Sequence, residues 1–86
     1  MMNKQEMEPG TQVAKMTPEA QGNVNHASVE HGIVVTFAPG SNKYYIHLWN
    51  KKGLKLVPAS VLMPHRTVPG MIAMKKLQDI LAGKGV

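Results

Sequence analysis

The chain has 86 residues, no cysteine and a formal net charge of +5. A chain of this length supports one domain at most, and without cysteine it can form neither a disulfide nor a thiolate zinc site. No apolar run approaches the roughly 20 residues of a membrane-spanning helix, and the first ten residues lack the apolar segment of a secretory signal. We therefore expect a cytoplasmic protein that makes no use of a membrane.

The charge is spread unevenly along the chain. Residues 1–30 carry two lysines and four glutamates, a net −2, whereas residues 31–86 carry eight Lys or Arg and one aspartate, a net +7. A field of this sign attracts phosphate groups or acidic protein surfaces. The alternative is ordinary solubility charge, because net charges of about 2 to 8 are common in small domains.

The first 30 residues contain no Phe, Tyr, Trp, Leu or Ile. Such a composition buries too little apolar surface to offset an ordering cost of about 1–2 kcal/mol per residue. We therefore predict a flexible N-terminal tail over residues 1–30 and a small basic domain over residues 31–86. Within the tail, Thr17 followed by Pro18 is typical of a helix start with threonine as the N-cap.

A strand and a turn open the predicted domain. Residues 33–37 are β-branched and aromatic, which favours a strand, and Pro39-Gly40 then has the spacing of a type II turn. The next segment, 43–56, has the alternation of a hairpin, and a left-handed Gly53 in its turn would place Leu48 opposite Leu56 and Trp49 opposite Lys55.

This register gives the hairpin two faces of opposite chemistry. The predicted core face carries Tyr44, Ile46, Leu48, Leu54 and Leu56. The predicted surface face is aromatic and cationic and carries Lys43, Tyr45, His47, Trp49 and Lys55.

The rest of the chain completes the predicted fold. Pro58 cannot donate to a strand ladder, so it makes the third strand an edge, and residues 59–63 form either a fourth strand or one helical turn. A helix is predicted from about residue 68 to 82, with Thr67 as its cap and Gly83 at its end. Its apolar stripe consists of Ala73, Met74, Leu77, Ile80 and Leu81.

The predicted fold is therefore α+β, a three- or four-stranded antiparallel sheet with the C-terminal helix packed on one face and a flexible N-terminal tail. The core of such a domain is small. The free energy gained by burying it roughly equals the entropy cost of ordering the chain, so the net stability is near zero. We therefore expect self-association through an exposed strand edge, or ordering on a larger partner.

Catalytic chemistry is sparse in the sequence. Four histidines, His26, His31, His47 and His65, are the candidates for metal or acid/base chemistry. They lack the i, i+4 spacing of a helical zinc motif, and no cysteine or carboxylate cluster completes a site. We expect no metal, no cofactor and no enzymatic activity.

The basic and aromatic side chains lead to the first functional hypothesis, a small nucleic-acid-binding protein without strong sequence specificity. Trp49 and Tyr45 would stack on bases at roughly 1–3 kcal/mol each, while Lys and Arg neutralise phosphates. The predicted contact set is Lys43, Tyr45, His47, Trp49, Lys51, Lys52, Lys55, Arg66, Lys75 and Lys76. The alternative is that Trp49 and Tyr45 pack beneath the N-terminal tail or beneath residues 59–63.

A second hypothesis is a protein-binding accessory that docks on an acidic surface. An assembly subunit or an inhibitor of the kind carried by phages and plasmids would have this small size, exposed strand edge and adaptable tail.

Short motifs provide a third hypothesis: Gly40-Ser41 before the second strand, Val57-Pro58 after it, and Val68-Pro69-Gly70 at the start of the helix. With these motifs, residues 32–86 resemble HicA-type toxins, small ribonucleases with a double-stranded-RNA-binding-like fold. That family places its catalytic histidine directly after Gly-Ser, where this chain has Asn42. It also has an N-terminal helix that this sequence lacks, so no catalytic residue is carried over.

Overall fold

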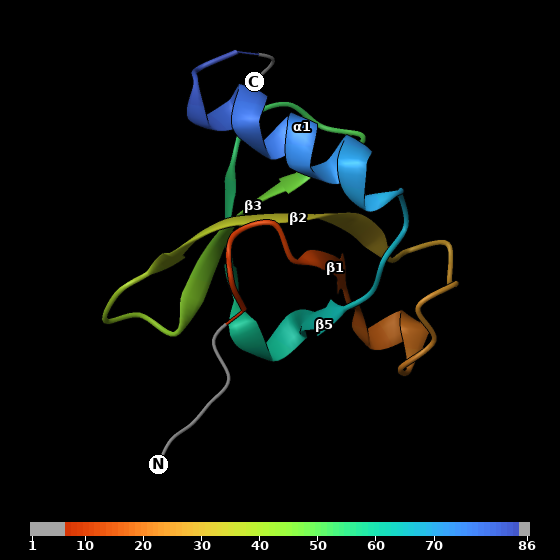
Figure 1. Ribbon diagram of the computed structural model, residues 1–86. Coiled ribbons are helices and arrows are strands. Elements are labelled where there is room, and N and C mark those ends of the chain that lie inside the picture. The colour runs from red at the N-terminus through yellow and green to blue at the C-terminus, as the bar shows by residue number, and fades with distance from the viewer. Residues whose placement is uncertain (1–6, 85–86) are drawn as a thin grey trace.

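The computed structural model describes residues 7–84, which form a five-stranded antiparallel sheet and one C-terminal α-helix (Figure 1). The elements in chain order are β1 (Gln12–Lys15), the 3-10 turn η1 (Pro18–Ala20), β2 (Glu30–Ala38), β3 (Lys43–Leu48), β4 (Lys55–Pro58), the 3-10 turn η2 (Ala59–Val61), β5 (Leu62–Pro64) and α1 (Gly70–Leu81). The strand order is β4-β3-β2-β1-β5. The predicted α+β class is confirmed, but the sheet is larger than the three or four strands expected.

Residues 7–30 differ from the predicted flexible tail, because they contribute β1, an interior strand of the sheet. β1 pairs with β2 on one side and with β5 on the other, and Val13 and Ala14 are fully buried. Thr17 caps η1, as its hydroxyl accepts a hydrogen bond from the Ala20 N–H at 3.2 Å. The prediction considered only large apolar side chains and therefore missed β1. Because β1 has a neighbouring strand on each side, its backbone hydrogen bonds hold it in the sheet. Residues 1–6, the start of the predicted tail, lie outside the described residues.

The predicted strand at 33–37 and the turn after it are confirmed. The β-branched residues lie in β2, and Gly40 has the positive φ, +81°, that a type II turn requires at this position. The N–H of Ser41 donates to the carbonyl oxygen of Ala38 at 3.3 Å and closes the turn. This turn leads directly into β3.

The predicted register of the β3–β4 hairpin is wrong by three positions. Leu56 lies opposite Tyr45, not Leu48, and Val57 lies opposite Tyr44. An odd shift exchanges the two faces of a strand, so Val57 becomes a core residue while Leu56 is 43% exposed. Gly53 is left-handed as predicted, with φ +76°.

Two apolar clusters lie on opposite faces of the sheet. The inner face, defined by its buried cluster, consists of Val13, Val34, Tyr44, Ile46, Leu48 and Val57. Side chains from η2 and β5 pack against this cluster. The helix face consists of the cluster that α1 completes, namely Ile33, Val35, Ala73, Leu77 and Ile80. Because the sheet is covered on both faces, consecutive residues of β3 can all be buried.

The helix is shorter than predicted, and two of the five residues of its apolar stripe are exposed. It begins at Gly70 after Pro69, not after Thr67, and the left-handed Gly83 follows its end as expected. Its side chains Ala73, Leu77 and Ile80 are buried, whereas Met74 is 45% and Leu81 66% exposed. It is not long and apolar enough to cross a membrane, and neither is any other helix among the described residues.

The two edges of the sheet are short. β4 has four residues and ends in Pro58, and β5 has three and ends in Pro64. Short edges with proline disfavour the addition of another strand. The sequence predicted self-association through a strand edge. The shape of these two edges does not support that prediction.

Candidate functional site

The loop that precedes α1, residues 65–69, is anchored on one side by β1. The Gln12 side-chain oxygen accepts hydrogen bonds from the N–H groups of Thr67 and Val68, both at 2.9 Å, and its amide nitrogen donates to the Val68 carbonyl at 2.7 Å. The His65 N–H also donates to the Gln12 backbone carbonyl at 3.0 Å. β1 therefore determines where this loop and the start of α1 lie.

Trp49, directly after β3, holds the same loop from the other side. Its indole Nε1 donates to the Thr67 hydroxyl at 3.0 Å, and its backbone N–H donates to the carbonyl of His31 at 2.9 Å. Its ring packs partly buried against the cluster on the helix face. The alternative considered from the sequence, in which Trp49 packs beneath the N-terminal tail or residues 59–63, did not name this partner: Trp49 packs against the cluster that α1 completes and bonds to the loop before α1.

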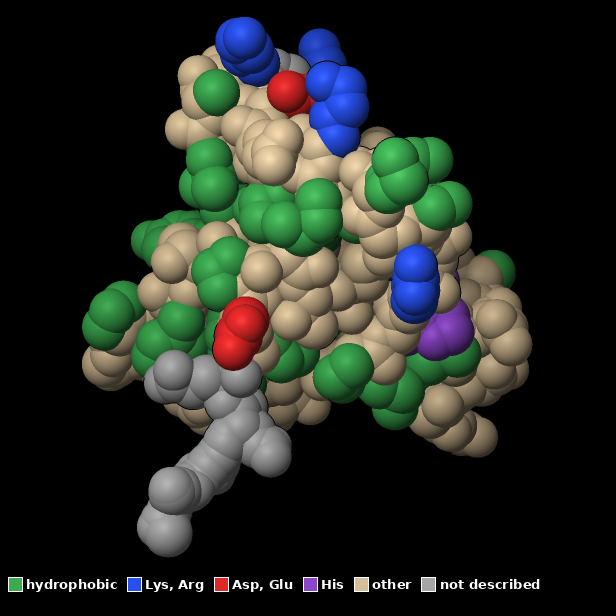
Figure 2. Space-filling view, viewed as in Figure 1, with side chains coloured by type: hydrophobic (Ala, Val, Ile, Leu, Met, Phe, Trp, Pro, Cys, Tyr) green, Lys and Arg blue, Asp and Glu red, His purple; other side chains and the backbone are tan. Residues whose placement is uncertain are grey.

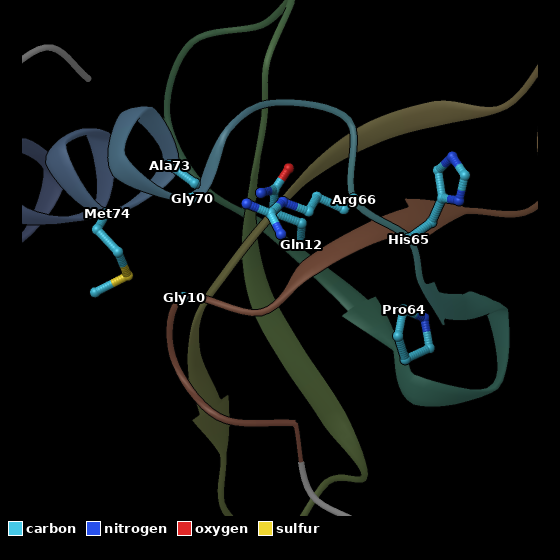
Figure 3. Close-up of a pocket in the computed structure, with 8 residues that line it drawn as sticks. All are labelled: Gly10, Gln12, Pro64, His65, Arg66, Gly70, Ala73 and Met74. Atoms are coloured by element: carbon cyan, nitrogen blue, oxygen red, sulfur yellow. The ribbon is translucent and has the colours of Figure 1, made fainter.

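An open groove of about 530 Å³ lies between β1, β5 and the start of α1; we call it the Arg66 groove. Its lining residues are Gly10, Gln12, Pro64, His65, Arg66, Gly70, Ala73 and Met74. Figure 3 shows that the Arg66 and Gln12 side chains project into the middle of the groove, whereas His65 points away from it. A Cβ atom at Gly70 would lie 3.3 Å from Arg66 Nη2, so the guanidinium covers this glycine.

The Arg66 groove is electropositive. Arg66 forms no ion pair or hydrogen bond with another described residue. The first N–H groups of α1 face no cap, because Pro69 supplies no side-chain acceptor. Unpaired N–H groups and the helix dipole favour a negative charge at this end of a helix. The groove therefore suits an anionic group.

A second open groove, of about 310 Å³, lies on the other side of the loop; we call it the Trp49 groove. Its lining residues are Val29, Glu30, His31, Trp49, Asn50, Thr67 and Val68. The carboxylate of Glu30 lies 3.1 Å from Lys51 Nζ and 4.0 Å from Lys15 Nζ, so its charge is neutralised locally. Thr67 and Val68, the residues held by Gln12, divide this groove from the Arg66 groove.

The predicted contact residues separate into groups in the structure. Trp49 lies at the loop before α1, which also contains Arg66, and the exposed Lys51 and Lys52 follow Trp49 in the β3–β4 connection. Tyr45 is 39% exposed beside Leu56 in the middle of β3. Lys75 and Lys76 lie on α1, where Lys75 is 3.9 Å from Asp79.

The remaining three predicted contacts lie on β3 and β4. Lys43 shares the face of Tyr45, whereas Lys55 does not, because it lies opposite Ile46. His47, predicted on the surface, is only 2% exposed. Its Nδ1 donates to the Gly53 carbonyl at 3.0 Å, since a carbonyl can only accept, and it thereby holds the β3–β4 connection.

Sequence reasoning missed the residues that shape the site. Gln12 lies in a polar segment with no motif around it, and Thr67 has the sequence context of a helix cap. Neither signal reveals a hydrogen bond to a residue more than 15 positions away, such as the one between Thr67 and Trp49. The sequence offered no pattern from which either role could have been found.

Two histidines meet between the grooves. The rings of His31 and His65 are 5.4 Å apart, and the buried Nδ1 of His31 has no hydrogen-bond partner in the structure. Among residues 7–84, no group of three or more His, Asp or Glu side chains is placed to hold a metal ion.

Comparisons of the chain with protein families, with curated proteins and with solved structures found no match. The resemblance to HicA-type toxins therefore has no support from a family match.

Proposed function

We propose that the protein binds nucleic acid through its phosphate backbone, with Arg66 as a central contact. The observation that carries this proposal is the set of cations without an acidic partner among residues 7–84: Lys43, Lys52, Lys55, Arg66 and Lys84. An unpaired basic surface releases counterions from a polyanion on binding, which is the main source of non-specific nucleic-acid affinity.

Arg66 is the cation most favourably placed for this contact. It projects into an open groove beside the start of α1, and its guanidinium lies near Gly70 (Figure 3). Arginine donates hydrogen bonds in a planar fork that matches a phosphate, and the helix dipole adds to the attraction. A phosphate in this groove would meet both.

Salt dependence tests the proposal. If four of these cations each contact one phosphate, the logarithm of the affinity falls with the logarithm of salt concentration at a slope of about −2.8 on a single strand and about −3.6 on a duplex. Fluorescence anisotropy of a labelled oligonucleotide, titrated at several salt concentrations, measures this slope. A flat response, or no binding at low salt, would contradict the proposal.

A matched pair of variants tests the role of Arg66. Arg66→Gln and Lys84→Gln remove the same charge from exposed positions, but only Arg66 lies in the groove. We expect Arg66→Gln to weaken binding by about 1.5–3 kcal/mol and Lys84→Gln by much less. Equal effects would mean that only net charge matters.

A second candidate function, binding to an acidic protein, is favoured by the uncovered side of α1. Met71, Met74 and Leu81 are 87%, 45% and 66% exposed, and at 3.6 residues per turn they fall within about 80° of the helix circumference. Figure 2 shows hydrophobic side chains at the surface on the face that carries α1, with Lys or Arg side chains above them. Methionine-rich surfaces adapt to different partners, and the lysines would favour an acidic one.

A capture experiment separates the two candidates. An acidic partner taken from a host extract by the wild-type protein should be lost with Met71→Gln/Leu81→Gln and retained with Arg66→Gln. Nucleic-acid binding should show the reverse pattern. Loss of both activities with either variant would argue against two separate surfaces.

A further inference from the structure

We propose that the Trp49 groove accepts one unpaired base of a single-stranded nucleic acid, while neighbouring cations contact the phosphates. This inference rests on the nucleic-acid function proposed above and narrows its ligand to a flexible single strand. In a duplex the bases are stacked and paired, and single-strand binders combine a basic path with aromatic rings on which freed bases stack.

The indole of Trp49 is held in place before any ligand arrives. Its Nε1 donates to Thr67 Oγ1, its backbone N–H donates to His31, and the His47 ring lies edge-on to it at 6.0 Å. An aromatic wall fixed in this way loses little conformational entropy on binding. Trp49 is only partly buried, and it lines the groove.

The size and lining of the groove suit one planar ring system. Its volume of about 310 Å³ is at the lower end of the range of ligand pockets, about 300–1,000 Å³. Val29 and Val68 provide apolar walls beside Trp49, and the exposed Asn50 can donate and accept hydrogen bonds at the edge of a base.

The charges around the Trp49 groove suit the phosphate backbone of a single-stranded nucleic acid. Glu30, the acidic residue in the lining, is paired with Lys51 at 3.1 Å, so it presents little net negative charge. Lys52 follows in the same loop, and the Arg66 side chain lies in the Arg66 groove, beyond Thr67 and Val68. A strand whose base enters the Trp49 groove would therefore have Lys52 near one flanking phosphate, and it would reach Arg66 only across the loop.

The decisive experiment compares two strands with the same phosphates. The wild-type protein is titrated with a short labelled oligothymidylate and with the same strand in which every base is replaced by an abasic site. Anisotropy reports the affinity, and the fluorescence of Trp49, the only tryptophan, reports the groove. We expect the strand with bases to bind roughly 5- to 100-fold more tightly and to quench Trp49.

The other outcomes separate this inference from the function on which it rests. Equal, salt-dependent binding of both strands would overturn the base site and leave phosphate binding intact. Binding of neither strand would overturn the proposed function itself. Tighter binding of a duplex of the same length would also overturn the base site, because paired bases cannot enter the groove.

A blocking variant locates the base. Asn50 lies exposed at the groove, so Asn50→Phe should fill it without unfolding the protein, and Asn50→Ala serves as the matched control. We expect Asn50→Phe to remove the difference between the two strands and Asn50→Ala to retain most of it, with thermal melts verifying the fold. A full preference for bases in Asn50→Phe would place them elsewhere and overturn the inference.

Discussion

Gln12 and Val68, 56 positions apart in the chain, are joined by two hydrogen bonds through one side chain. The Gln12 amide nitrogen donates to the Val68 carbonyl at 2.7 Å, and its oxygen accepts from the Val68 N–H at 2.9 Å. The side-chain amide of Gln12 thus satisfies both the N–H and the carbonyl of Val68, a residue that lies outside any strand or helix. It connects the N-terminal strand to the loop that presents Arg66.

Replacing this amide should loosen the loop. Gln12→Ala removes three hydrogen bonds, each with a net value of about 0.5–1.5 kcal/mol, so we expect a loss of about 2–3 kcal/mol in the free energy of unfolding. Urea denaturation measures the loss. Gln78→Ala, an exposed change on α1, is the control and should stay within about 0.5 kcal/mol. Similar values for both variants would contradict the role of Gln12.

Two adjacent residues on β4 test the register of the hairpin. Val57 is 1% exposed in the inner cluster, whereas Leu56 is 43% exposed. Val57→Ala should therefore cost about 2 kcal/mol, and Leu56→Ala less than about 1 kcal/mol. The midpoints of urea denaturation give both values. The register predicted from the sequence would require the opposite order, so a larger loss at Leu56 would refute the structure here.

The left-handed turn residue Gly53 should tolerate asparagine better than valine. Its φ is +76°, and a Cβ added there would meet nothing within 4 Å, so the cost of substitution arises from the backbone alone. We expect Gly53→Val to lose at least about 1–2 kcal/mol and Gly53→Asn clearly less. Thermal melts of the two variants suffice for the comparison, and an unchanged melt for Gly53→Val would count against this turn.

Gly70 offers a change that separates binding from stability. Its backbone does not require glycine, but a Cβ there would press on the Arg66 guanidinium at 3.3 Å. We expect Gly70→Ala to keep or raise stability by up to about 1 kcal/mol, because alanine favours a helix. The displaced guanidinium should weaken oligonucleotide binding by about 1 kcal/mol, or roughly fivefold. Unchanged affinity would mean that the position of Arg66 does not matter.

The local features of the fold followed from the sequence because they depend on neighbouring residues. The β-branched run that became β2, the positive φ of Gly40, Gly53 and Gly83, and the terminal helix all reflect local backbone preferences. The segment 59–63 was predicted as a helical turn or a strand, and it contains η2 followed by most of β5. Local preference cannot choose between two short elements that adjoin.

The candidate site was only partly predictable. The basic character of residues 31–86 and the presence of Trp49 near lysines are properties of the sequence itself. The burial of His47 is not, because alternation along β3 assigns it to a face without saying what covers that face. Alternation placed Tyr45, His47 and Trp49 together, but Lys55 lies on the other face, and Trp49 packs against the cluster that α1 completes.

By itself the sequence determined the fold class, the excess of positive charge and the places where the chain must turn, since composition, charge and backbone preference are local properties. The tertiary structure alone decided the register of β4, the inclusion of β1 in the sheet and the contact between Gln12 and Val68. These depend on which distant segments meet, and an alternating pattern fits several registers until packing on both faces selects one. The loop before α1, which contains Arg66, therefore lies beside Trp49 only because β1 and the end of β3 pack against it.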